Sequence, residues 1–191
     1  MKRRARGRRR LLLAGAGFVA ALAVVLTVTG VFSHVIKELT LPLRHEDIIR
    51  QQAQDKGVDA SLIAAVIYAE SRFRDQTSHA GARGLMQITP TTAKEIERLS
   101  GGTTFKLEDL SDPDINIRYG TFYLAELLKR FDGSEVAALA AYHAGPTAVE
   151  RWGGSSLTID QIPIDETRGY VEEVLDKKED YRREYAQELG Y

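Results

Sequence analysis

The chain has 191 residues, of which 43% are hydrophobic and 28% charged, which is ordinary for one globular domain with additional segments. It has no Cys, which excludes a disulfide framework and a lipid-modified cysteine. The net charge of −1 hides an uneven distribution. Residues 1–10 carry seven basic side chains and no acid, so the other residues hold 19 of the 26 basic side chains and all 27 acidic ones. A basic tail alone could bind nucleic acid, but the segment that follows it argues against that partner.

The first predicted element is an apolar segment, residues 11–32, which runs for 22 residues without a charge. About 20 such residues span a bilayer as a helix, so we expect a single transmembrane anchor. Its basic flank, residues 1–10, is expected to stay in the cytoplasm. A cleavable signal peptide has the same order of parts, but its apolar part is normally roughly 7–15 residues long and ends in a small-x-small site. Both alternatives export the rest of the chain, and the anchor predicts a single-pass protein of the cell membrane.

The remainder divides into a short linker, residues 33–44, and a folded domain, residues 45–191. Cap residues, prolines at first helical positions and helix-ending glycines mark the helices of this domain. The expected helices are 45–56, 60–71, 90–101, 113–130, 134–142, 146–152 and 166–189. Only residues 157–164 alternate as a strand does, and Pro163 argues against one. The sequence therefore predicts one mainly α domain.

An acid interrupts the pattern of the second expected helix. Its apolar positions between Leu62 and Ile67 form a stripe, and three or four further residues lead to Glu70. A carboxyl group at the end of an apolar stripe loses water, which raises its pKa and suits it to general acid catalysis near neutral pH. The alternative is that Glu70 simply points into solvent at the helix end. Nearby polar residues and glycines favour a site; they include Ser71, Ser78, Gly81, Gly84, Gln87, Tyr142 and Gly145.

Metal and cofactor sites are not expected. The four histidines, His34, His45, His79 and His143, have no spacing typical of a metal site, and Cys is absent. The Gly-rich stretch after Glu70 matches neither phosphate-binding spacing.

Four sequence blocks carry a resemblance to a known family: Glu70–Phe73, Gly84–Pro90, Ala141–Pro146 and Glu166–Val171. With them, the chain from about Val58 to Leu175 resembles the catalytic domain of lytic transglycosylases of the soluble, family 1 type, which is similar to goose-type lysozyme. The resemblance implies a lysozyme-like α domain with a glycan-binding cleft. It also implies cleavage of the β-1,4 bond between N-acetylmuramic acid and N-acetylglucosamine in peptidoglycan strands, with no cofactor.

The resemblance also assigns residues. Glu70 corresponds to the catalytic acid and base, and Ser78 to a serine near the acetamido group of the sugar. Tyr170 corresponds to a tyrosine whose hydroxyl faces the catalytic glutamate. The expected substrate-binding residues are Ser78, Met86, Gln87, Tyr142, His143 and Tyr170, although Tyr142 could equally pack in the core. Trp152 and Tyr119 could stack on sugars, but aromatic residues at helical spacing more often belong to a core.

His143 departs from the family pattern, which usually has Asn at this position. Histidine can donate and accept a hydrogen bond, as Asn does, but it can also become charged. Two alternatives stay open: a protonated imidazole that holds anionic wall polymer, with a KM that rises from about pH 6 to 8, or a neutral one that makes a single hydrogen bond.

The resemblance accounts for the presence of only one marked carboxylate. Glycosidases usually need two, and Asp75, the nearest other acid, lies in a polar loop where we expect it to be solvated. In the family, the sugar's N-acetyl group is thought to stabilise the transition state, and the same glutamate then deprotonates the 6-hydroxyl to give a 1,6-anhydro product. A muramidase that uses water and a non-catalytic glycan-binding module are the competing functions.

Overall fold

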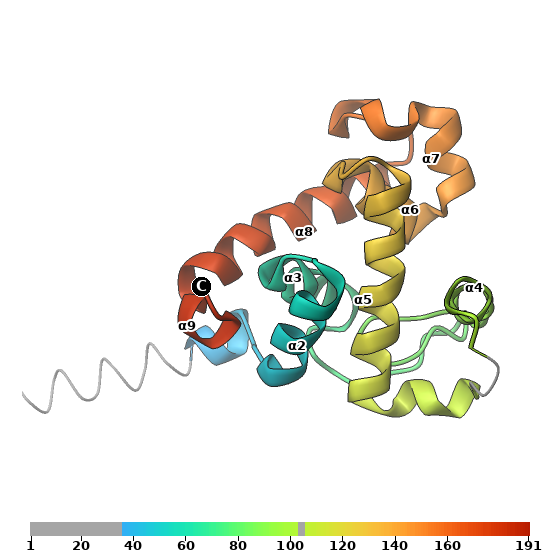
Figure 1. Ribbon diagram of the computed structural model, residues 1–191. Helices are drawn as coiled ribbons and strands as arrows, with labels where there is room; N and C mark the ends of the chain where they lie inside the picture. Colours follow the sequence, from blue (N-terminus) through green and yellow to red (C-terminus); the bar gives the residue numbers. More distant parts are fainter. Residues whose placement is uncertain (1–35, 103–105) are drawn as a thin grey trace, which may run out of the picture. The chain divides into compact units, whose positions relative to one another are not determined.

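The computed structural model describes residues 36–102 and 106–191 (Figure 1). The residues from Leu43 to Tyr191 form one compact unit, and the chain up to Pro42 belongs to another. The fold below is that of the unit from Leu43 onward.

One part of the predicted fold class needs correction, namely the transmembrane helix ahead of the domain. The part of the chain that the structure describes contains no helix that is both long and apolar enough to cross a bilayer. Residues 1–10 and 11–32, on which the predicted flank and anchor rest, lie outside the described residues. The fold that the structure describes is therefore a mainly helical domain.

Helices account for nearly all regular structure in the described domain, as the caps predicted. The α-helices are α2 (Glu46–Lys56), α3 (Ala60–Ser71), α4 (Pro90–Ser100), α5 (Pro113–Arg130), α6 (Glu135–Ala144), α7 (Pro146–Trp152), α8 (Asp165–Glu184) and α9 (Ala186–Leu189). Three 3-10 helices connect them: η1 (Leu107–Ser111), η2 (Gly154–Ser156) and η3 (Ile159–Gln161). In the described residues, extended pairing is limited to two isolated bridges, Thr77 with Arg83 and Arg83 with Ile88.

Side-chain caps start the helices where the sequence predicted. The Asp59 carboxylate accepts hydrogen bonds from the backbone N–H groups of Ser61 and Leu62, at 2.8 and 3.2 Å. Thr89 and Asp112 cap α4 and α5 in the same way, and each is followed by a proline at the first helical position. Such caps satisfy N–H groups that the first helical turn leaves without a partner.

Helix α3 lies in the middle of the domain. Every residue from Ala60 to Tyr68 is buried, which explains why this segment is apolar almost all round. It packs against α8 and α2, while α5 packs against α2 and α6 (Figure 1). Lys178 of α8 donates to Glu135 of α6 at 2.7 Å, which joins the two helices that flank the end of α3.

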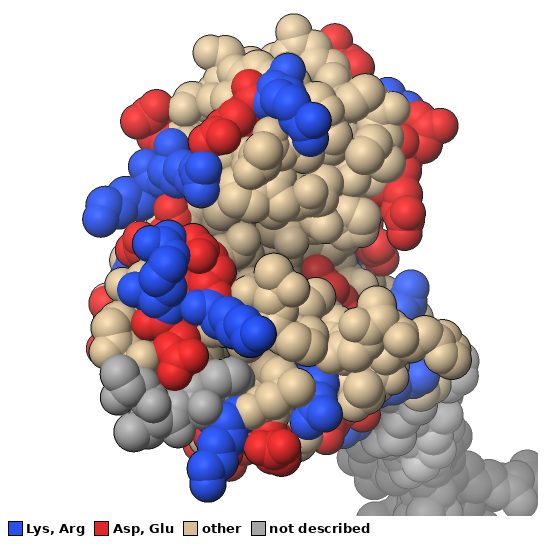
Figure 2. All heavy atoms as spheres, turned by 90° about the vertical axis from the view of Figure 1, so that its right-hand side faces the viewer, with Lys and Arg blue, Asp and Glu red and all other residues tan. Residues whose placement is uncertain are grey.

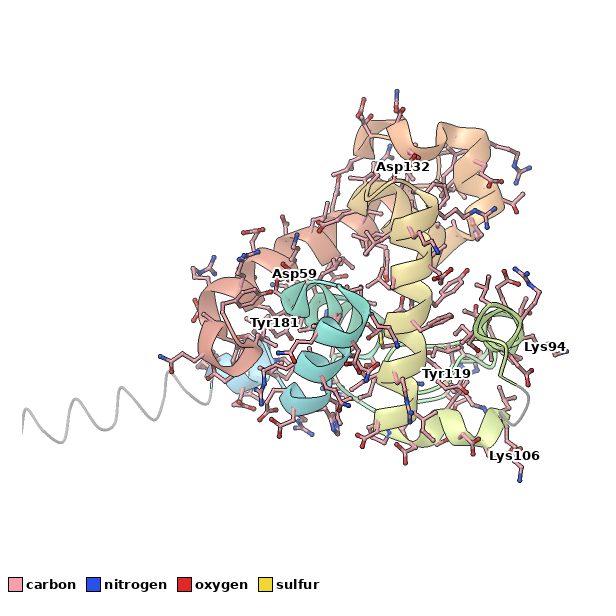
Figure 3. All side chains as sticks on the ribbon, viewed as in Figure 1. Asp59, Lys94, Lys106, Tyr119, Asp132 and Tyr181 are labelled. Carbon is pink, nitrogen blue, oxygen red and sulfur yellow. The ribbon has the colours of Figure 1, made fainter. Side chains whose placement is uncertain are left out.

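The end of the domain differs from the sequence prediction. Residues 166–189 do not form one helix, because α8 stops at Glu184 and the chain turns into the short α9. This turn returns Tyr191 to the start of α3, where its hydroxyl donates to Asp59 at 2.5 Å. Figure 3 shows Asp59 and Tyr181 on the neighbouring helices α3 and α8. The beginning of α3 is therefore held from the far end of the sequence.

Candidate active site

Glu70 lies in the last turn of α3, where the chain changes direction sharply. The next two residues after Ser71, Arg72 and Phe73, both have left-handed backbone conformations, with φ of 51° and 59°. Two successive non-glycine residues in this region are uncommon and need support from their surroundings. Phe73 supplies that support, because its side chain is 4% exposed and its ring centroid lies 6.1 Å from that of Tyr181. The turn holds Glu70 at the end of a rigid helix.

The surroundings of Glu70 favour its neutral form. Burial raises the pKa of the Glu70 carboxyl to about 7, and the nearby Tyr170 hydroxyl opposes the shift. Among the described residues, no second carboxylate contributes to this shift. The Tyr170 hydroxyl is buried, and no hydrogen bond of standard geometry joins it to any described group. The Tyr170 hydroxyl nevertheless acts on the pKa of Glu70 as a hydrogen-bond donor does.

Tyr170 comes from α8 and Tyr142 from α6, so three helices meet at Glu70. The pKa of each tyrosine lies well above its ordinary value because of burial, and the Glu70 carboxylate raises both further. The two phenols thus stay protonated at neutral pH, and Tyr170 presents an O–H donor to the Glu70 carboxyl group. Burial thus keeps the proton on Glu70, and the Tyr170 phenol can stabilise the carboxylate after the proton has left.

Asn116 of α5 organises the loop between Glu70 and α4. Its side-chain carbonyl accepts from the Met86 N–H at 2.8 Å, and its amide donates to the carbonyls of Arg83 and Leu110 at 2.9 and 3.0 Å. The side chain is completely buried. One amide thus satisfies three backbone groups, which is how a buried loop avoids unpaired polar atoms.

Two glycines allow this loop to lie close to α5. A Cβ on Gly84 would come within 2.1 Å of the Asn116 amide nitrogen, and its φ of +74° also favours glycine. A Cβ on Gly120 would come within 2.4 Å of the Met86 sulfur. The Met86 side chain is therefore packed in the core and fully buried, and the structure does not bring it to the surface where a ligand could touch it.

Two other predicted loop residues are partly exposed. Gln87 has φ of 45°, and its side-chain amide donates to the carbonyls of Gly84 and Gln76 at 2.8 and 3.0 Å. The Ser78 hydroxyl accepts from the Ala82 N–H at 3.1 Å. Both side chains stabilise the loop from within, and their partial exposure leaves room for a further contact.

His143 lies at the end of α6, against α8. Its Nδ1 is 3.1 Å from the Thr167 hydroxyl, and its ring centroid is 4.7 Å from that of Tyr170. Burial lowers the pKa of the imidazole below its ordinary value, and the charge of Glu166 opposes this shift. The residue as a whole remains exposed. The neutral form is favoured at pH 7, as in the second of the two alternatives that the sequence left open.

The face that carries α4 and α7 is hollowed between the parts formed by these helices (Figure 2). The loop with Met86 and Gln87 leads directly into α4, and α6 leads into α7. Asp75 is exposed, in agreement with the expectation that it is solvated. Tyr119 and Trp152 are partly buried, and Tyr119 contributes to a separate depression beside α4 (Figure 3).

Comparison with known proteins identifies the fold and the family. The transglycosylase SLT domain family matches residues 47–162, well over half of the sequence. The chain belongs to this family. Lytic transglycosylase Slt from Pseudomonas aeruginosa, solved as an inactive mutant with glutamine in place of glutamate, has a TM-score of 0.72 and 36% identity over 78% of this chain. The likeness confirms the predicted lysozyme-like helical domain for the described residues.

The relatives that this chain resembles are much longer than the matched region. Soluble lytic murein transglycosylase of Escherichia coli K12 is 34% identical over 164 residues, or 81% of this chain and 25% of the relative. The structure of the 70 kDa E. coli soluble enzyme matches with a TM-score of 0.71, covering 76% of this chain and 25% of that one. A membrane-bound lytic murein transglycosylase F from Desulfosudis oleivorans is 41% identical over 109 residues, or 53% of this chain and 22% of the relative. The chain thus spans about a quarter of the length of these relatives.

The structure adds residues that sequence reasoning missed. Asn116 and Thr167 hold the loop and the end of α6, and both are buried, at 0% and 1% exposure. A polar residue between Ile115 and Ile117 was a usable signal for Asn116. Thr167 lies in one of the sequence blocks that carry the family resemblance, but its partner His143 could be recognised only in three dimensions. No group of three or more acidic or histidine side chains among the residues with described positions could hold a metal ion.

Proposed function

We propose that this SLT domain is a peptidoglycan lytic transglycosylase that cleaves the β-1,4 bond between N-acetylmuramic acid and N-acetylglucosamine. The product is a 1,6-anhydro end on the muramic acid residue. The observation that carries the proposal is Glu70, a single carboxyl group with a pKa of about 7 beside two tyrosine hydroxyls. A relative whose glutamate-to-glutamine mutant is described as inactive supports a reaction that depends on one glutamate.

In the proposed reaction, neutral Glu70 first gives its proton to the oxygen between the two sugars. The bond from that oxygen to the anomeric carbon breaks, and the acetamido oxygen of the muramic acid residue stabilises the positive charge at the carbon. Glu70 is now a carboxylate, and the Tyr170 hydroxyl is close enough to donate to it after a small movement.

In the second half of the reaction, the Glu70 carboxylate takes the proton from the 6-hydroxyl of the same muramic acid residue. The oxygen attacks the anomeric carbon, which closes the anhydro ring and returns Glu70 to its neutral form. A pKa near the working pH suits a group that acts as acid and then as base. We propose that the hollow between α4 and α7 receives the glycan strand, with Gln87 and Ser78 at its border.

The test is mass spectrometry of purified peptidoglycan after digestion with this protein. Anhydro-muramic acid ends, lighter by one water than reducing ends, are the expected product. Reducing ends would instead establish a muramidase, and intact wall that still binds the protein would establish a glycan-binding module. The Glu70→Gln variant serves as the blank for contaminating hydrolases.

A further inference from the structure

We propose that His143 is a positioning residue that holds the Tyr170 phenol against Glu70, an inference that rests on the proposed function. His143 reaches α8 at two points. Its Nδ1 is 3.1 Å from the Thr167 hydroxyl, and its ring lies against that of Tyr170 with centroids 4.7 Å apart and planes inclined by 33°. Thr167 and Tyr170 are three residues apart and so lie on the same face of α8. The imidazole spans one helical turn and joins the end of α6 to that face.

Tyr170 needs such support because the effect of its hydroxyl on Glu70 depends on where the phenol is held. It is buried, and no described group forms a hydrogen bond of standard geometry with it. A buried hydroxyl normally has a partner, so its position here depends on what packs around the ring. The His143 ring supplies one wall, and the Glu70 carboxylate is the acceptor that the hydroxyl gains when Glu70 loses its proton.

The charged and titratable groups around this contact are few. Tyr142 of α6 and Tyr170 of α8 face Glu70, and Glu173 of α8 acts on Tyr170. Glu166, at the start of α8, acts on His143. The pKa of His143 lies below its ordinary value because burial outweighs the effect of Glu166. The imidazole is therefore mainly neutral at pH 7 and acts through its hydrogen bond and its ring face.

The asparagine expected at this position from the family resemblance could bond to Thr167 but has no ring to place against Tyr170. The two contacts can therefore be separated by substitution. His143→Asn keeps a hydrogen-bonding group without the ring, and His143→Phe keeps a ring without the hydrogen bond. His143→Ala removes both, and Thr167→Val removes only the hydroxyl partner.

The decisive measurement is the titration of Glu70 in the unliganded protein, followed by carbon NMR of protein labelled at glutamate carboxyl carbons. Tyr170 lowers the pKa of Glu70, so a misplaced phenol lets it rise. We expect His143→Ala and His143→Asn to raise the Glu70 midpoint by about half a pH unit, and His143→Phe to leave it near the wild-type value. The alkaline limb of kcat/KM should move by the same amount. His45→Asn, at the left-handed start of α2, is the matched control and should move neither.

A double-mutant cycle separates positioning from a general loosening of the fold. If His143 acts through Tyr170, then His143→Ala has no further effect on the Glu70 midpoint in a Tyr170→Phe background, because the hydroxyl is already absent. An equal shift in both backgrounds would overturn the proposal, as would an unchanged midpoint in a folded His143→Ala protein. If His143→Ala does not fold, His143→Asn carries the same test, and Thr167→Val, which keeps the His143 ring, should leave the Glu70 midpoint near the wild-type value.

The two proposals fail in different ways. The titration needs no substrate, so it reports on His143 even if the wild-type protein yields no anhydro product. An absent anhydro product with a normal His143 effect would overturn the proposed function alone. Anhydro product with a Glu70 midpoint that is insensitive to His143 would overturn the positioning role alone.

Discussion

The hydroxyl of Tyr142 donates a 2.8 Å hydrogen bond to the main-chain carbonyl of Met86. This bond ties the last turn of α6 to the loop that follows Glu70 and precedes α4. The Met86 N–H is held by Asn116 of α5, so the backbone of this one residue is held by both α5 and α6. This clamp therefore fixes the loop that leads into α4 against both helices.

Removing the tyrosine hydroxyl should loosen this clamp. We expect Tyr142→Phe to cost about 1 kcal/mol of unfolding free energy, because one hydrogen bond to a buried carbonyl is lost. The loop should lose order as well, so kcat on purified peptidoglycan should fall. Urea unfolding and initial rates of wall digestion test this expectation. Stability and turnover that both match the wild type would show that the bond is dispensable.

Glu70→Gln should abolish turnover while leaving the fold intact. The amide has nearly the same shape, but it cannot deliver a proton or remove one. General acid or base catalysis is worth about 10²- to 10⁴-fold, and here one group performs both steps, so we expect a loss at the upper end of that range or beyond. Initial rates of anhydro-muropeptide release provide the measurement. A variant that keeps more than about a tenth of the activity would contradict the role of Glu70 as the acid and base.

The same substitution should stabilise the protein at alkaline pH. The folded protein binds the Glu70 proton more tightly than the unfolded chain does, because its pKa is about 7 instead of the ordinary 4.5. Wild-type stability therefore falls as pH rises from about 4.5 to 7 through this group, and stays low above it. We expect Glu70→Gln to be more stable than the wild type by about 2–3 kcal/mol at pH 8.5, with a smaller difference at pH 5. Urea midpoints at both pH values test this; a constant difference would refute the linkage.

The reaction rate should fall as pH rises, because Glu70 acts first as a neutral acid. Because Glu70 must carry its proton at the start of the reaction, kcat/KM should be high below pH 7 and fall about tenfold per unit above it. Tyr170→Phe should move this limb to higher pH, since the hydroxyl lowers the pKa of Glu70. The exposed Asp75 should have no part in the limb, so Asp75→Asn is the control. If kcat/KM falls at the same pH in Tyr170→Phe as in the wild type, the Tyr170 hydroxyl does not set the pKa of Glu70.

Asn116 should be among the most sensitive positions outside the site itself. Asn116→Ala leaves the Met86 N–H and the carbonyls of Arg83 and Leu110 without their partner, so we expect a loss of about 2–4 kcal/mol. Asp114→Ala, on an exposed position of the same helix, should change the unfolding free energy by less than about 1 kcal/mol. Urea unfolding of both variants provides the comparison. Similar losses in the two would mean that the buried amide contributes little.

Much of the helical framework was predictable because its signals are local. Three helix starts are marked by a side chain that accepts hydrogen bonds from backbone N–H groups of the first turn, namely those of Asp59, Thr89 and Asp112. The expected 166–189 helix was predicted too long because its end depends on Tyr185 and Tyr191 turning back to the domain, which no local pattern encodes. The apolar run of residues 11–32, which predicted a membrane helix from length and hydropathy, lies outside the described residues, and no helix within those residues is long and apolar enough to cross a bilayer.

The site, too, was predictable only in part from the sequence. The apolar stripe of α3 and the four sequence blocks identified Glu70, Tyr142, His143 and Tyr170 without any structure, and the structure brings these four together at the ends of α3 and α6 and in the first turns of α8. They also suggested Met86 as a cleft residue, whereas its side chain fills the space opened by Gly120. A residue name within a motif does not say which way its side chain points.

By itself, the sequence determined the helices, the family and the position of an acid at the end of a buried helix, because caps, periodicity and sequence blocks act over a few residues. Only the tertiary structure decided that this acid is mainly neutral below about pH 7. That property depends on α6 and α8, which come from distant parts of the chain and displace water around Glu70. Desolvation depends on all the segments that pack around a group in the folded protein, so no local sequence pattern can predict how far it raises the pKa.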